Sequence, residues 1–134
     1  MLVGKKATID GSTIIARDED GESGINQKTF KVFPARDYDS GVRIPLHGHG
    51  CRFTATPNAQ ENEIKGRWDE QGINEYNVAM SATETEGTNA RCLGHDPLVK
   101  NGIDEDSMLY LVLPFIKTAR EGVARLGKLI EQYG

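Results

Sequence analysis

The sequence is poor in cysteine and contains no long apolar run. Its two cysteines, Cys51 and Cys92, are too few for a disulfide framework, and we expect both to be free thiols in a reducing cytoplasm. No apolar stretch approaches the roughly 20 residues that a membrane-spanning helix needs, and the first residues carry no signal-peptide core. We therefore expect a cytoplasmic protein without a membrane partner.

An excess of positive charge is also missing. The chain has 16 Lys and Arg against 20 Asp and Glu, which gives a net charge of -4 at pH 7. This balance gives no reason to expect a nucleic acid or an anionic membrane as a partner. No phosphate-binding loop, dinucleotide fingerprint or internal repeat occurs, and we expect no cofactor.

The length and composition are those of one globular domain. A chain of 134 residues buries roughly two-thirds of the surface that it exposes when unfolded. Its apolar content of 37%, charged content of 27% and mean hydropathy of -0.50 are typical of globular proteins. We expect residues 1–134 to form a single domain.

Residues 2–20, LVGKKATIDGSTIIARDED, predict a β-hairpin. Asp10-Gly11 favours a tight two-residue turn, because Gly readily adopts the positive φ that such a turn needs. The expected arms are residues 2–9 and 13–16, and the second is apolar enough to be covered on both faces. Four charges, Arg17 to Asp20, follow the second arm, where either a solvated loop or a functional site is expected.

The remaining elements place strands before helices. Strands are predicted within residues 28–35, 51–56, 60–68 and 77–85, whereas residues 36–50 and 86–101 are too irregular to assign. Such an order predicts an α+β fold, with C-terminal helices lying on an antiparallel β-sheet.

Two helices are predicted near the C-terminus. The first is capped by Asp104 and should break near Leu113, because Pro114 lacks an N–H group. The second should turn Val123, Leu126 and Ile130 toward the sheet, as their spacing of three or four residues indicates.

One motif has the composition of a metal site. On a strand, His47, His49 and Cys51 would share a face, with His95 or Cys92 as a fourth ligand. The interspersed glycines favour a turn with partly exposed histidines instead, and no CxxC or HExxH motif accompanies them. We therefore expect no bound metal.

Three segments resemble the dipeptidase A family, cysteine peptidases of the N-terminal-nucleophile hydrolase superfamily. They are residues 2–20, residues 72–87 (GINEYNVAMSATETEG) and residues 96–134. The resemblance covers essentially the whole chain but only the N-terminal part of the longer family enzymes. It implies a dipeptide substrate and makes residues 1–134 the N-terminal portion of a longer catalytic domain.

The same resemblance implies that the fold is part of an αββα sandwich, in which two sheets face each other. One part of such a sandwich leaves apolar sheet surface uncovered. This surface is a candidate contact in a homo-oligomer.

The resemblance also implies catalytic roles. The family's mature chain begins with Cys-Thr-Thr a few residues upstream of the Leu-Val-Gly-Lys-Lys segment, and this Cys supplies both the nucleophilic thiol and an amine base. Here Met1 precedes that segment directly, and we expect the polypeptide as written to be inactive. Arg17 and Asp20 match the superfamily's Arg-x-x-Asp spacing, in which Arg favours the thiolate and Asp binds near the amine. On the residues alone, a surface ion pair is the commoner outcome for Arg17.

A later strand of the superfamily's acylases carries an oxyanion-stabilising Asn. Glu84 aligns near this position, but a carboxylate cannot donate the same hydrogen bond, and Asn74 and Asn77 are nearby alternatives. Three hypotheses follow: a truncated cysteine dipeptidase, a non-catalytic piece that assembles with the missing remainder, and a small metal-binding protein.

Overall fold

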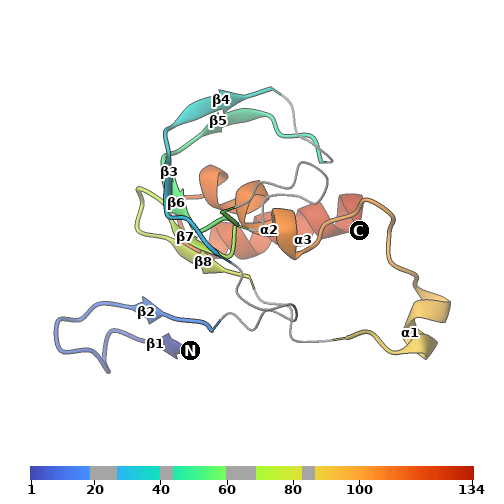
Figure 1. Ribbon diagram of the computed structural model, residues 1–134, viewed down its shortest axis with the longest axis horizontal. Coiled ribbons are helices and arrows are strands. Elements are labelled where there is room, and N and C mark those ends of the chain that lie inside the picture. Colours follow the sequence, from blue (N-terminus) through green and yellow to red (C-terminus); the bar gives the residue numbers. More distant parts are fainter. Residues whose placement is uncertain (19–26, 40–43, 60–68, 83–86) are drawn as a thin grey trace.

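The computed structural model describes residues 1–18, 27–39, 44–59, 69–82 and 87–134 (Figure 1). Its strands form antiparallel pairs. They are β1 (Leu2–Val3) with β2 (Ile14–Ile15), β3 (Lys31–Phe33) with β6 (Phe53–Ala55), β4 (Arg36–Tyr38) with β5 (Gly48–Gly50), and β7 (Gln71–Ile73) with β8 (Ala79–Ser81).

β3 and β4 form one arm of a long hairpin, and β5 and β6 form the other. The pairs Phe33↔Phe53 and Arg36↔Gly50 have the same register, although the ladder is interrupted between them. Pro34 has no N–H to donate there, and the Cys51 amide donates to the Pro114 carbonyl at 2.7 Å instead. The interruption therefore changes the hydrogen bonding without shifting the register.

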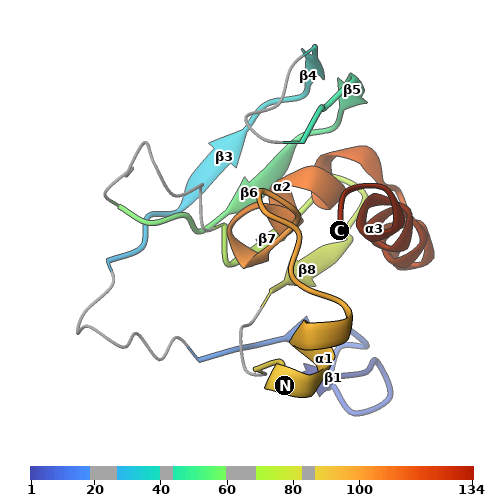
Figure 2. The same ribbon diagram turned by 90° about the vertical axis from the view of Figure 1, so that its right-hand side faces the viewer.

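β6 and β7 are neighbours, so that β3, β6, β7 and β8 form one layer. An isolated bridge joins Phe53 to Asn74, and the Thr56 amide donates to the Gln71 carbonyl at 3.1 Å. Figure 2 shows helices on one face of this layer, whereas the β1–β2 hairpin and α1 (Ala90–His95) lie outside it. The structure is thus α+β, with antiparallel strands and C-terminal helices, as the sequence predicts.

The helices begin and end where local signals indicate. The Asp104 side chain caps α2 (Glu105–Val112), and Pro114 lies in the 3-10 turn η1 (Leu113–Phe115) that ends it. Thr118 and Glu121 form a reciprocal capping box at the start of α3 (Ala119–Tyr133). No helix in the described ranges is both long and apolar enough to cross a bilayer.

The core lies between the sheet layer and the helices. Phe33 stacks on Phe53 with ring centroids 4.8 Å apart, and Leu109 and Leu113 are buried against this layer. Gly72 permits a close approach, because a Cβ there would lie 2.0 Å from the Thr54 carbonyl oxygen. Val32 and Ile73 alternate with the inward-facing Phe33 and Gly72, so they lie on the opposite face, where both are exposed, as is Phe30 just before β3.

Two expectations about burial are wrong. Ile14 in the second hairpin arm is exposed, because nothing in the described chain covers its outer face, and both arms are shorter than predicted. In α3, Leu126 packs against the core as predicted, but Val123 and Ile130 are exposed, while Gly122 and Leu129 are buried. The helix is rotated from the expected orientation because Gly122 approaches Ile116 closely, at a Cβ-equivalent distance of 2.9 Å.

The structure also contains elements that were not assigned from the sequence. β4 and β5 lie within residues 36–50, and α1 lies within residues 86–101. The strand expected at residues 60–68 lies outside the described residues.

The rotation of α3 changes the expected cost of truncating its side chains. Leu129→Ala should lower the free energy of unfolding by roughly 2–5 kcal/mol, because the leucine is buried in the core. Val123→Ala should change it by less than about 0.5 kcal/mol, because that side chain is exposed. Urea unfolding monitored by circular dichroism measures both. Equal losses at the two positions would contradict the observed orientation.

Candidate functional site

The β1–β2 hairpin brings the first residue of the chain beside Arg17. The Met1 amine donates to the Ala16 carbonyl at 2.6 Å, and the Ala16 amide donates to the Met1 carbonyl at 3.0 Å. These bonds continue the ladder that pairs Leu2 with Ile15. The start of β1 and the residue that precedes Arg17 are therefore direct neighbours.

Local turn chemistry holds the far end of this hairpin. Gly11 has a φ of 76°, and the Ser12 amide donates to Asp10 Oδ1 at 3.0 Å. Hydrogen bonds from the Ser12 side chain and amide lower the pKa of the Asp10 carboxyl below its ordinary value. The predicted two-residue turn at Asp10-Gly11 is nevertheless wrong. Val3 pairs with Ile14, so residues 4–13 connect the two strands, and Gly11 but not Asp10 has a positive φ within this longer connection.

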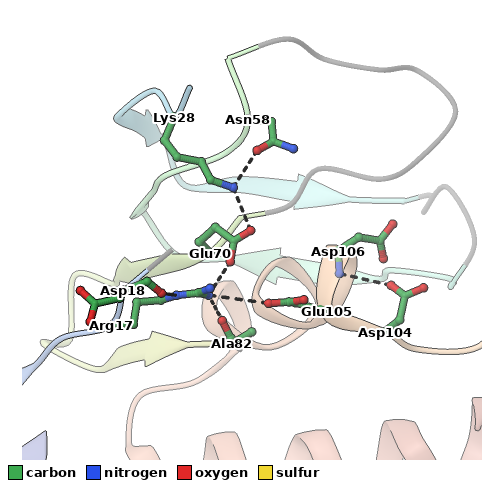
Figure 3. A network of polar contacts seen from close by, with 9 residues as sticks. All are labelled: Arg17, Asp18, Lys28, Asn58, Glu70, Ala82, Asp104, Glu105 and Asp106. Atoms are coloured by element: carbon green, nitrogen blue, oxygen red, sulfur yellow. Dashed lines mark hydrogen bonds and ion pairs between the residues drawn. The ribbon is translucent and has the colours of Figure 1, made fainter. Parts of the chain in front are cut away.

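Arg17 lies in a polar network rather than on an open surface (Figure 3). Its side chain is only 14% exposed, and its Nη1 donates to the Glu70 carboxylate and to the Ala82 carbonyl. Glu105 Oε1 lies 3.7 Å from the same nitrogen. The interpretation of Arg17 as a surface ion pair is therefore wrong, since its principal partner is a carboxylate that is 7% exposed.

The network continues from Glu70 to the long hairpin. The Lys28 ammonium donates to Glu70 Oε1 at 2.8 Å and to Asn58 Oδ1 at 2.6 Å. Glu70 comes just before β7, Lys28 just before β3 and Asn58 shortly after β6. Segments far apart in the sequence thus meet around one buried carboxylate.

The other residues considered for catalysis are placed differently. Asp20 and Glu84 lie outside the described residues. Asn74 is buried, and its amide nitrogen donates to the carbonyls of Leu113 and Ile116 at 3.0 and 2.7 Å. Its Oδ1 accepts two backbone amides of its own turn, which makes Asn74 a structural link between the sheet and η1.

The residues of the suspected metal motif do not converge. His49 is exposed and contacts Asp37, with 2.8 Å between Nδ1 and Oδ1, and His47 is also exposed. Cys51 is buried, and burial raises the pKa of its thiol, with the Glu75 carboxylate adding to the effect. Within the described ranges, no group of three or more His, Cys, Asp or Glu side chains could hold a metal ion.

Sequence reasoning missed Glu70 and Lys28. They lie 53 and 11 residues from Arg17 along the chain, and no local pattern links them to it. The available signal was a charged residue next to a strand, but the sequence has many of these. Only the packing of β2 beside β8 shows which of them meet.

Comparison with known proteins extends over the full chain. Residues 1–134 match peptidase family C69. "Probable dipeptidase B" of Lactococcus lactis subsp. lactis is 48% identical over 141 residues, an alignment that covers 100% of this chain and 29% of the relative. "Probable dipeptidase" of Latilactobacillus sakei is 49% identical over 142 residues, with 100% and 30% covered. "Dipeptidase" of Bifidobacterium longum is 48% identical over 154 residues, with 100% and 28% covered.

The family match and the three relatives all cover the whole chain, and the relatives are all named as dipeptidases. The chain spans about 30% of the length of the relatives that it matches. The segments that suggested a cysteine peptidase from the sequence all lie inside the matched region. The chain belongs to peptidase family C69.

Proposed function

We propose that this chain forms the N-terminal part of the catalytic domain of a cysteine dipeptidase. In this proposal the enzyme hydrolyses dipeptides, and Arg17 and Asp20 act in its site. The names of the relatives, which are dipeptidases, support this substrate class. Two free cysteines are in keeping with a cytoplasmic location.

The position of the chain start beside Arg17 carries the proposal. Because Leu2 pairs with Ile15 in an antiparallel ladder, the residue directly before Met1 would lie opposite Arg17, and the Cys of a Cys-Thr-Thr-Met start would lie two positions, about 7 Å, further along the strand. A nucleophile on a short extension of β1 would therefore reach the end of β2, where the guanidinium is held. A positive charge near a thiol favours the negatively charged thiolate and lowers the thiol pKa.

The chemistry requires a thiol and a free amine on one residue. The amine, with an unperturbed pKa of roughly 7.7–8.0, takes the thiol proton near neutral pH. The thiolate then attacks the peptide carbonyl, the C–N bond breaks, and the amino product leaves with the proton. Water hydrolyses the resulting thioester and restores the thiol. Cys51 and Cys92 each have an amide where this mechanism needs an amine.

The uncovered face of the sheet layer supports an αββα arrangement. Phe30, Val32 and Ile73 are exposed on the face opposite the helices. A second sheet from the remainder of a longer chain would bury them, and a second copy of this chain offers a similar apolar surface for a homo-oligomer. The same exposed apolar residues therefore underlie both the enzyme proposal and the hypothesis that this chain assembles with a missing remainder.

An engineered start tests the proposed site. The 134-residue polypeptide should show no dipeptide hydrolysis above a no-enzyme control, because its cysteines lack the required amine. Replacing Met1 with a processed Cys-Thr-Thr-Met start should give a thiol with a pKa below the free value of about 8.5. Its alkylation at pH 7 should be faster than that of Cys51 or Cys92, and Arg17→Ala should slow it. Mass spectrometry of iodoacetamide-treated protein resolves the three thiols.

Two results would count against this proposal. The site assignment fails if the new thiol reacts like a free cysteine and Arg17→Ala leaves its rate unchanged. The mechanism fails if the original polypeptide hydrolyses dipeptides and keeps this activity after Cys51→Ala and Cys92→Ala together.

A further inference from the structure

Glu70 lies where β7 and β8 meet the end of the β1–β2 hairpin. The Ala82 amide donates to the Glu70 carbonyl at 3.1 Å, which continues the β7–β8 ladder by one pair and fixes the Glu70 backbone. The Ala82 carbonyl and the Glu70 carboxylate both accept from Arg17 Nη1. A single nitrogen of Arg17 is thus held by two acceptors that belong to the same ladder pair.

The second oxygen of Glu70 is held from another direction. Glu70 Oε1 accepts from Lys28 Nζ at 2.8 Å, whereas Oε2 accepts from Arg17. Lys28 is itself fixed, because its backbone forms an antiparallel bridge with Asn58 and its ammonium donates to the Asn58 side chain. The orientation of the Glu70 carboxylate is therefore set by both long-range partners (Figure 3).

Charges of both signs surround the Glu70 carboxylate and Arg17. A buried carboxylate is costly unless it is paired and hydrogen-bonded, and Glu70 is 7% exposed. Arg17 and Lys28 supply two positive charges, and Glu70 and Glu105 supply two negative ones. Asp18 is the exposed neighbour of Arg17, and its backbone carbonyl accepts from Arg17 Nε at 3.3 Å.

We propose that Glu70 is a positioning residue, which holds the Arg17 guanidinium at the end of the β1–β2 hairpin where an N-terminal thiol would lie. This inference rests on the proposed function, because it gives Glu70 a role through Arg17. Lys28 supports this role, because its ammonium binds the second oxygen of the Glu70 carboxylate. Glu70 contacts no substrate in this scheme.

Positioning and simple electrostatics predict opposite effects when Glu70 loses its charge. If Glu70 were only a nearby negative charge, Glu70→Gln would make the surroundings more positive and lower the thiol pKa. If Glu70 positions Arg17, the same change weakens the hold on the guanidinium, because glutamine offers one neutral acceptor oxygen for the two cations that the carboxylate binds, and the thiol pKa rises toward its free value of about 8.5. The direction of the change separates the two roles.

The experiment compares two matched substitutions in the chain that carries the Cys-Thr-Thr-Met start. Glu70→Gln and Glu105→Gln remove the same charge near Arg17, but only Glu70 accepts a close hydrogen bond from it. Glu70→Gln should slow iodoacetamide alkylation at pH 7 about 3- to 10-fold, the change that a pKa rise of roughly 0.5 to 1 unit produces. Rates near pH 10, where the thiol is ionised in all variants, should converge. Glu105→Gln should leave the rate at pH 7 unchanged or raise it slightly.

A double variant covers the case in which Glu70→Gln alone does not fold. Glu70→Gln with Lys28→Met removes one charge of each sign, so the net charge around Arg17 does not change. It should also slow alkylation at pH 7, because Arg17 has still lost its anchor. A rate equal to that of the unsubstituted chain would overturn the inference.

Hydrogen exchange in the original chain supplies a readout that does not need the thiol. The Ala16 amide, bonded to Met1, should exchange faster in Glu70→Gln than in Glu105→Gln, while core amides such as that of Leu113 remain protected. Equal exchange at Ala16 in both variants, or faster alkylation in Glu70→Gln, would refute the positioning role. If Arg17→Ala leaves the thiol unaffected while Glu70→Gln still frees Ala16, the proposed function fails but the anchoring of the hairpin stands.

Discussion

Gly72→Ala is expected to lower the free energy of unfolding by more than about 4 kcal/mol, a loss found only when a substitution disrupts tightly packed structure. The added Cβ would lie 2.0 Å from the Thr54 carbonyl oxygen and 3.0 Å from Leu113 Cδ2. Neither atom can move easily, since one belongs to the neighbouring strand β6 and the other is fully buried. The substitution therefore separates β7 from β6 or displaces η1.

Gly127→Ala is the matched control for this prediction. Gly127 lies exposed in α3, and an added methyl group there would have no neighbouring atom within 4 Å. Alanine should stabilise the helix at this position by up to about 1 kcal/mol. Urea unfolding of both variants gives the comparison, and a loss below about 1 kcal/mol for Gly72→Ala would mean that β6 and β7 are not packed this closely.

Arg17→Met is expected to lower the free energy of unfolding by about 3 kcal/mol, near the lower end of the range for breaking one buried ion pair. The buried Glu70 carboxylate would keep Lys28 as a partner but lose its bond to Arg17. The Ala82 carbonyl would lose the same donor. The β1–β2 hairpin would thus lose its principal polar contact with the sheet layer.

Arg120→Met provides the exposed counterpart. Arg120 lies on the outside of α3, so its replacement should change stability by less than about 0.5 kcal/mol. Combining Arg17→Met with Glu70→Met should cost less than the sum of the two single substitutions, because each single substitution already removes the Arg17–Glu70 interaction. Additive losses in thermal or urea unfolding would show that Arg17 and Glu70 do not interact in solution.

The parts of the fold that depend on local chemistry were predictable from the sequence. Asp104 caps α2 and Pro114 ends it, because each acts on its own backbone. The tight turn predicted at Asp10-Gly11 was wrong, because β1 pairs with β2 in a register that leaves residues 4–13 as the connection. The orientation of α3 was not predictable from its apolar spacing. Gly122 has no side chain to contribute to that pattern, yet it is the residue that packs against Ile116.

The candidate site also has one part that was predictable from the sequence and one part that was not. Arg17 was identified from a resemblance in the sequence, whereas the observed register of the hairpin is what places it beside the chain start. Its burial and its partners were not predicted, since Glu70 and Ala82 reach it only through the pairing of β7 with β8 and the packing of β2 beside them. No periodicity of 2 or 3.6 residues contains that information.

The shared register of β3–β6 and β4–β5 sets a rule for how the length of this chain can vary. Since side chains alternate between the two faces of a strand, deleting one residue at Pro34 or Ala35 would shift β4 by one position. Tyr38, which is buried against Tyr110 and Phe115, would then turn outward. Related proteins with this hairpin should accept insertions and deletions between β4 and β5. The connections between β3 and β4 and between β5 and β6 should keep their length.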